Sequence, residues 1–265
     1  MARSCRPADR RRLPGTPEVT VWRRASPPRS GFPDTARHRD WHYVNQPIGE
    51  SPDRVLRGRL HEAIPQLRAW FADPASLYGA YSLVWLLHLV ADLHQPLHVS
   101  TRRLPGGGHD AGGNEVDVLI DAALLPHRRR DRSPKLHACW DELVAPPWLA
   151  GEQLARLRDR PVHEHPRRGG PVDPAAWRAQ SFALAVDAYR GLKASGRPTR
   201  ISADAHRQNQ RIAERQVTLA GYRLADLLGA ALAAAENSAE SGTDRQRIAG
   251  DKILRRQPAA ASALQ

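Results

Sequence analysis

The stretch from Ser82 to Ser100 reads Ser-Leu-Val-Trp-Leu-Leu-His-Leu-Val-Ala-Asp-Leu-His-Gln-Pro-Leu-His-Val-Ser. Apolar residues fill most positions of its first half, which predicts a helix that is buried on nearly every side. His88 and Asp92 lie four residues apart in this helix, so their side chains project from the same face. Pro96 cannot continue the helix, because it lacks an N–H group and clashes with the preceding turn. The chain therefore bends before His98.

A second segment, Leu136-His137-Ala138-Cys139-Trp140-Asp141, repeats the His-x-x-x-Asp spacing among apolar and aromatic neighbours. One such pair alone is best interpreted as a buried ion pair, because short motifs recur by chance. The two pairs and His98 together offer five nitrogen and oxygen ligands without a thiolate, which is the ligand chemistry of zinc in a hydrolytic site. A third pair, His127 and Asp131, lies in an Arg-rich run that predicts an exposed loop, and we assign it no metal.

Two of these segments, His88 to His98 and Leu136 to Asp141, are accompanied by two further short segments. These are Trp41-His42-Tyr43-Val44-Asn45, which precedes them, and Gly112-Gly113-Asn114, which lies between them. In chain order the four segments resemble the signature segments of the S1/P1 nuclease family, and the resemblance runs from about Phe32 to Leu232. That family is all-helical, is related to zinc-dependent phospholipase C, and hydrolyses single-stranded nucleic acids and 3′-nucleotides with three clustered zinc ions. The resemblance implies an all-α, single-domain fold around a buried metal cluster.

The resemblance also implies roles for individual residues. Asp34, Arg37 and Asp92 are the implied catalytic residues, and Asn114 and Arg37 are implied to bind the substrate. Asp92 would also bridge from its own zinc ion to a neighbouring metal site, which the family completes with residues of its N-terminus. The implied metal ligands are Asp34, His42, His88 and Asp92 for one zinc ion, and His98, His137 and Asp141 for another.

Structural interpretations of two of these residues stay open at this stage. Asp34 and Arg37 lie in a segment similar to the family's Trp-Ala-Asp-x-x-Arg, but Asp34 is equally well explained as a turn residue or helix N-cap. His42 has the apolar neighbours Trp41 and Val44, which also suit a core histidine.

Asn114 ends a Gly-rich loop, where the lack of side chains lets backbone amides approach a ligand. We expect this loop to border the substrate cleft, with Asn114 as a hydrogen-bonding residue.

Length and composition favour one large helical domain, because 265 residues with 41% hydrophobic content can bury a sizeable core. The net charge of +12 suits a polyanionic partner such as single-stranded nucleic acid. It is weak support by itself, because a chain so rich in Arg and Ala can also reflect nucleotide composition. We expect a disordered or aberrant segment at 1–31, the helical domain at 32–235 and a disordered tail at 236–265.

Residues 1–31 contain no apolar run of seven or more, so the sequence as written predicts neither a signal peptide nor a membrane span. Members of the family are secreted, which implies a secreted or periplasmic protein. Their N-terminal Trp and a nearby His bind one zinc ion, whereas Trp22 here is followed by Arg-Arg-Ala-Ser. Our hypothesis is that Met1 is not the natural beginning, and that the chain as written binds two zinc ions where the family binds three.

The remaining apolar periodicities predict scaffold helices at 55–71, 148–160, 174–191 and 203–235. The expected activity is that of a zinc-dependent endonuclease and 3′-nucleotidase that leaves 5′-phosphates, acting as a monomer. Two alternatives stay open. One is a zinc-stabilised, catalytically impaired protein that binds nucleic acid, and the other is a phospholipase C-like phosphodiesterase with the same metal cluster.

Overall fold

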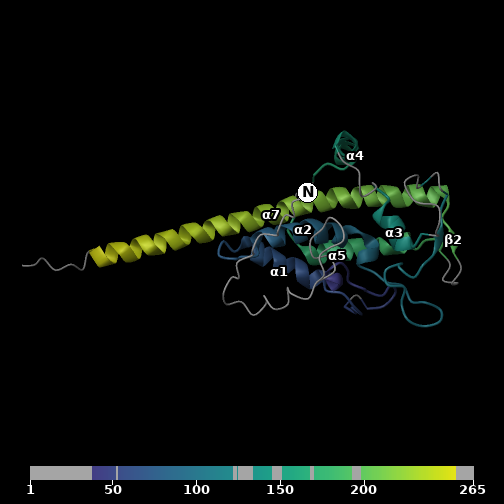
Figure 1. Cartoon of the computed structure of the whole chain (residues 1–265), viewed down its shortest axis with the longest axis horizontal. Helices are drawn as coiled ribbons and strands as arrows, with labels where there is room; N and C mark the ends of the chain where they lie inside the picture. The colour runs from purple at the N-terminus through teal and green to yellow at the C-terminus, as the bar shows by residue number, and fades with distance from the viewer. Residues whose placement is uncertain are drawn as a thin grey trace, which may run out of the picture. The chain divides into compact units, whose positions relative to one another are not determined.

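The computed structural model describes residues 38–51, 53–121, 124, 134–144, 151–167, 170–192 and 198–254. Over these residues the chain is mostly helical with two short strands, which confirms the expected all-α fold (Figure 1). Asp34, Arg37 and the run from His127 to Arg132 lie outside the described residues. In chain order the elements are η2 (Arg39–Trp41), α1 (Leu60–Ala72), α2 (Gly79–His94), η3 (Pro96–His98), β1 (Val118–Leu119), α3 (Leu136–Asp141), α4 (Gly151–Glu164), α5 (Pro174–Ala183), α6 (Ala185–Ala188), β2 (Thr199–Arg200) and α7 (Ala203–Leu254).

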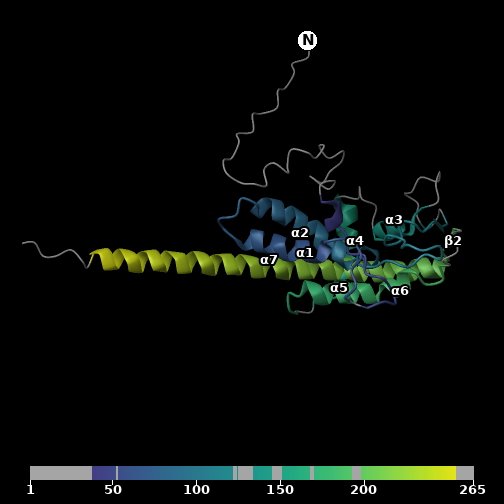
Figure 2. The same ribbon diagram turned by 90° about the horizontal axis from the view of Figure 1, so that it is seen from below.

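Helix α2 is the central helix of a bundle with α1, α5 and α7 (Figures 1 and 2). Its apolar positions meet all three neighbours, so the prediction of a helix with little exposed apolar surface is confirmed, except that Leu87 is 50% exposed. The helix ends at His94, and Pro96 begins the short helix η3 that carries His98. The fully or almost fully buried apolar residues of α2 are Trp85, Leu86, Leu89, Val90 and Leu93.

Helix α1 begins at Leu60, five residues later than the expected start at Val55. The physical reason is Gly58, whose φ of +92° is in the left-handed region that a helix excludes. A Cβ atom at this position would lie 2.1 Å from the carbonyl oxygen of Tyr43, so only glycine fits this close approach. This close approach of Gly58 to Tyr43 fixes the backbone next to His42 against the segment that leads into α1.

A second core, beside the bundle, is formed by η3, β1, α3, α6 and β2. Strands β1 and β2 are parallel and pair Val118 with Thr199, which brings two distant parts of the chain together. Cys139 and Trp140 of α3 are buried in this core. The other buried members are Leu97, Val116, Val118, Leu136, Leu143, Ala188, Tyr189 and Ile201.

Two further helices differ in their bounds from the sequence predictions. Helix α4 runs from Gly151 to Glu164 and thus continues past Arg160, where the expected helix ended, through Pro161 and His163. The expected helix at 174–191 is divided at Leu184 into α5 and α6. The start of α5 agrees with the sequence, because Asp173 caps it by accepting a hydrogen bond from the Ala176 N–H.

Helix α7 continues past Ala235, where we expected the folded domain to end, as far as Leu254. Residues 237–254 contain two Ala, one Glu and two Arg together with Gly242 and Gly250, so helix propensity alone does not account for this extension. In both views this C-terminal part of α7 extends beyond the other helices (Figures 1 and 2). Residues 255–265 lie outside the described residues.

The buried residues of α7 include Ala220, Leu227 and Ala231, whereas Val217 is 46% exposed. The part from Ala203 to Asn237 is long and apolar enough to cross a membrane by length and composition alone. Core helices of soluble proteins share this property, and α7 packs against α1 and α2. Since 22% of its apolar window is buried, α7 is a partly exposed helix of the bundle.

Candidate metal centre

Three side chains converge at the middle of α2, and we name His42, His88 and Asp92 the α2 group. His88 Nε2 lies 2.9 Å from His42 Nδ1 and 3.2 Å from Asp92 Oδ2. His42 Nδ1 lies 3.0 Å from the same carboxylate oxygen. Three atoms of metal-ligand type thus meet at one point, as the helical spacing of His88 and Asp92 predicted.

Aromatic packing holds the two imidazole rings of the α2 group in place. The ring of Trp85 contacts the ring of His42 edge-on, with centroids 5.5 Å apart, and that of Trp41 at 5.4 Å. The rings of His42 and His88 are almost perpendicular, at 88°. Because Trp85 is buried in the bundle, its position fixes the histidines from the protein side.

A second set of ligand-type side chains, which we name the α3 group, consists of His98, His137 and Asp141. His98 Nε2 lies 3.6 Å from Asp141 Oδ1, and His137 Nε2 lies 3.8 Å from Asp141 Oδ2. The ligand atoms of this group all lie within 4.8 Å of one another. It is looser than the α2 group and more open on one side, since the Asp141 side chain is 48% exposed.

Backbone carbonyls set the orientation of both histidines in the α3 group. His98 Nδ1 donates to the His42 carbonyl at 2.5 Å, and His137 Nδ1 donates to the Gly112 carbonyl at 2.8 Å. A carbonyl only accepts, so each Nδ1 carries a proton and each Nε2 is the nitrogen that faces Asp141. Gly112 has a φ of +64°, and a Cβ there would lie 2.3 Å from the Leu97 carbonyl oxygen.

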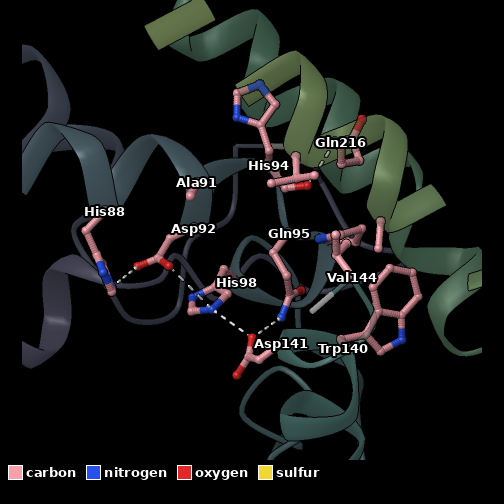
Figure 3. A pocket seen from close by; sticks show the side chains of 13 residues that line it. His88, Ala91, Asp92, His94, Gln95, His98, Trp140, Asp141, Val144 and Gln216 are labelled. Atoms are coloured by element: carbon pink, nitrogen blue, oxygen red, sulfur yellow. Dashed lines mark hydrogen bonds and ion pairs between the residues drawn. The ribbon is translucent and has the colours of Figure 1, made fainter. Parts of the chain in front are cut away.

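Asp92 connects the two groups. Its Oδ2 belongs to the α2 group, while its Oδ1 lies 3.8 Å from His98 Nε2 (Figure 3). Burial alone would raise the pKa of Asp92, but the charge of His98 and hydrogen bonds from His42 and His88 lower it well below its usual range. Asp92 is therefore a charged, buried carboxylate that faces both groups.

The same interactions separate the pKa values of the two histidines in the α3 group. Burial would lower the pKa of His98, but the charges of Asp92 and Asp141 raise it to about 9. Burial lowers the pKa of His137, and the nearby charge of His98 lowers it further. The shifts therefore favour the protonated form of His98 and the neutral form of His137.

The donor set of both groups fits zinc. Each group offers two imidazole nitrogens and a carboxylate, the ligand types of catalytic zinc sites that keep a position open. Tetrahedral zinc holds its ligand atoms about 3.3 Å from one another, from metal–ligand distances of about 2.0–2.1 Å. The separations of 2.9 to 3.2 Å in the α2 group lie slightly below this value. The α3 group needs a small contraction of its 3.6 and 3.8 Å separations.

A cavity of about 560 Å³ lies against both groups (Figure 3). His88, Asp92, His98 and Asp141 form its polar side. Its apolar side comes from α2, η3, α3 and α7, through Ala91, Pro96, Trp140, Val144, Ala213 and Val217.

His94 also lines this cavity, but it serves the scaffold. Its Nδ1 donates to the Val90 carbonyl at 2.7 Å, and its Nε2 lies 2.8 Å from Nη1 of Arg223 on α7. Burial lowers the pKa of His94 to about 4, which keeps the ring neutral so that Nε2 accepts from the guanidinium. Both of its nitrogens are therefore occupied.

The structure brings together six of the nine residues that the sequence singled out, namely the two groups. Asp34 and Arg37 lie outside the described residues. Asn114 is exposed and donates from its Nδ2 to the Ala111 carbonyl at 2.8 Å, and it is not among the residues that line the cavity. Sequence reasoning missed Gln95 and the Gly112 carbonyl, although both lie in segments that it had quoted.

Comparison with known proteins agrees with this geometry. The family model described as S1/P1 Nuclease matches residues 29–233, which is most of the chain. The chain belongs to the S1/P1 nuclease family. A search of curated proteins gives no match.

Membership of the S1/P1 nuclease family identifies the chain as a nuclease-type hydrolase of a zinc-dependent family that acts on nucleic acid. The α2 and α3 groups lie within the matched residues and are its candidate metal sites.

Proposed function

We propose that this chain is a zinc-dependent nuclease that hydrolyses phosphodiester bonds in single-stranded DNA and RNA, and also 3′-nucleotides, leaving 5′-phosphates. The observation that carries the proposal is the pair of His/His/Asp groups joined by Asp92 at the wall of one cavity. Two adjacent divalent ions suit the displacement at a phosphodiester, in which both an attacking and a leaving oxygen need stabilisation.

The residues have the following proposed roles. His42, His88 and Asp92, together with Asp34, hold one zinc ion, and His98, His137 and Asp141 hold a second. Bound zinc supplies Lewis-acid charge next to the phosphoryl oxygens and lowers the pKa of water. Asp92 would contribute to holding both ions, since its Oδ2 faces His88 and its Oδ1 faces His98. Arg37 and Asn114 bind the substrate outside these groups.

The cavity supports a substrate with an anionic end and an apolar, flat part. Its polar side suits a phosphate once cations are bound, while Pro96, Trp140 and Val217 suit the face of an unpaired base. A base inside a duplex is stacked and paired on both sides, so it does not reach such a cavity. The net charge of +12 favours the approach of a polyanion.

We further propose that the protein acts as a monomer in a secreted or periplasmic setting, in line with the typical location of the family. The absence of thiolates from both groups suits an oxidising compartment, because neither site depends on reduced cysteine.

The test is a combined measurement of metal content and turnover on one preparation. Purified protein is analysed for zinc by mass spectrometry and assayed on denatured DNA, duplex DNA, RNA, a 3′-nucleotide and phosphatidylcholine. We expect zinc-dependent cleavage of denatured DNA and RNA, with 5′-phosphates on the products. Bound zinc with binding but no turnover would indicate an impaired nucleic-acid-binding protein. Turnover of phosphatidylcholine alone would indicate a phospholipase C-like enzyme, and either result would refute the proposal.

A further inference from the structure

Gln95 lies at the bend between α2, which carries His88 and Asp92, and η3, which carries His98 of the α3 group. It is the last residue before Pro96, and its backbone serves both as the C-cap of α2 and as the N-cap of η3. Its side chain points toward Asp141 of α3 (Figure 3). It therefore connects the bend that carries His98 with the carboxylate of another segment.

The two ends of the Gln95 amide have different partners. Oε1 accepts a hydrogen bond from the Leu97 N–H at 2.5 Å, and Nε2 donates to Asp141 Oδ1 at 2.9 Å. This orientation follows from chemistry, because a backbone N–H only donates and an ionised carboxylate only accepts. A reversed amide would place two donors together at Leu97 and two acceptors together at Asp141.

We infer that Gln95 is a positioning residue for the α3 group: its oxygen sets the turn that carries His98, and its nitrogen fixes the Asp141 carboxylate. The inference rests on the proposed zinc site and adds a residue that does not bind the metal itself. With Oδ1 held by Gln95, Asp141 keeps Oδ1 toward His98 and Oδ2 toward His137. An exposed carboxylate without this bond would rotate freely and would have to be ordered by the metal.

Only an amide of this length does both tasks. Glutamate at this position accepts from Leu97 but cannot donate to Asp141, and it places a like charge beside that carboxylate. Alanine removes both hydrogen bonds. The variants Gln95→Glu and Gln95→Ala thus separate the effect on the bend from the effect on Asp141. Gln66, on the exposed face of α1, provides the matched controls Gln66→Glu and Gln66→Ala.

The experiment measures zinc affinity by competition with a chromophoric chelator, and the visible absorption spectrum after cobalt substitution. Both Gln95 variants should bind one of the two zinc ions about 10- to 100-fold more weakly, as is typical when a partner behind a metal ligand is removed. Their cobalt spectra should change, and the Gln66 variants should match the wild type. Circular dichroism melting confirms that each variant is folded.

The possible results separate the inference from the proposed function. Wild-type affinity and spectrum in both Gln95 variants would overturn the inference and leave the zinc site intact. Weak binding by Gln95→Ala with wild-type behaviour of Gln95→Glu would show that the side chain acts only through the bend, which also overturns it. A wild-type chain that binds no zinc would instead refute the proposed function, and the inference with it.

Discussion

The α2 group and the α3 group offer the same ligand types but are built differently. In the α2 group, His88 and Asp92 are neighbours on one buried helix, and the atoms of the group lie 2.9 to 3.2 Å apart. In the α3 group, the ion-pair separations are 3.6 and 3.8 Å, and Asp141 is half exposed. A helix inside a packed bundle holds ligands close together before any ion arrives, whereas a short helix between loops leaves them looser.

The supports of the two groups explain this difference. The α2 group packs against Trp85, which is buried in the bundle core. The packing that stabilises the bundle therefore also fixes the geometry of this group. The α3 group depends on contacts between remote segments, through the carbonyls of His42 and Gly112 and the amide of Gln95. We therefore expect the α3 group to gain more order from a bound ion, and to lose more when the ion is removed.

The largest effect is expected from Asp92→Asn, because Asp92 faces both groups. The amide keeps the size of the side chain and loses the charge, so activity on denatured DNA should fall by more than about a hundredfold, beyond the effect of removing partners behind the ligands. The melting temperature should change much less than activity. Steady-state assays and melting curves check this, with the exposed Asp204→Asn as control. Near wild-type hydrolysis would show that Asp92 is only an ion-pair partner in the core.

A comparison of His137→Ala with His88→Ala tests the two groups directly. Each variant should lose about one zinc ion per chain. His137→Ala should lower the melting temperature further, because zinc in the α3 group ties η3 to α3 and binding energy contributes to folding. Chelator should remove most of the difference between the variants. Equal melting temperatures would contradict the proposed asymmetry, and unchanged zinc content in His137→Ala would contradict the assignment of this ligand.

The sequence predicted the α2 group better than its surroundings. The spacing of His88 and Asp92 in an apolar helix was enough to place both on one face, and His137 and Asp141 followed the same rule. Gln95 could not be assigned a role, because its partner Asp141 is 46 residues away and only the folded chain joins them. The late start of α1 depends on the contact between Gly58 and Tyr43, which local periodicity does not contain.

Gly112→Ala tests the loop support of the α3 group with a smaller expected effect. The new Cβ would meet the Leu97 carbonyl oxygen and strain a residue with positive φ, at a cost of about 1–3 kcal/mol. The Gly112 carbonyl should shift away from His137, so zinc affinity of the α3 group should fall while the α2 group is unaffected. Gly229→Ala in α7 is the matched control, since nothing lies near its Cβ, and it should be neutral or slightly stabilising. Equal zinc binding in both variants would show that the loop does not position His137.

The smallest effect concerns alkaline pH and the second core, which supports the α3 group. Burial and the neighbouring Asp110 carboxylate raise the pKa of Tyr189 far above its ordinary value, while Arg102 lies 4.6 Å from the ring centroid and opposes this shift. Because the folded chain keeps the phenol proton and the unfolded chain releases it above about pH 10, the contribution of Tyr189 is fully present below that pH. At higher pH this contribution to the free energy of unfolding decreases by up to about 1.4 kcal/mol per pH unit. Melting temperatures from pH 8 to 11 should therefore fall more steeply in the wild type than in Tyr189→Phe.

The control for this measurement is Tyr222→Phe in α7, whose hydroxyl makes a long 3.5 Å contact with the Val162 carbonyl. It should follow the wild-type slope, because the groups that raise the pKa of Tyr189 lie around the second core. Asp110 also anchors the loop that leads to Gly112, because it accepts hydrogen bonds from Thr101 Oγ1 and the Arg102 N–H. If Tyr189→Phe and Tyr222→Phe have the same slope as the wild type, the weaker support of the α3 group has another origin than this buried pair.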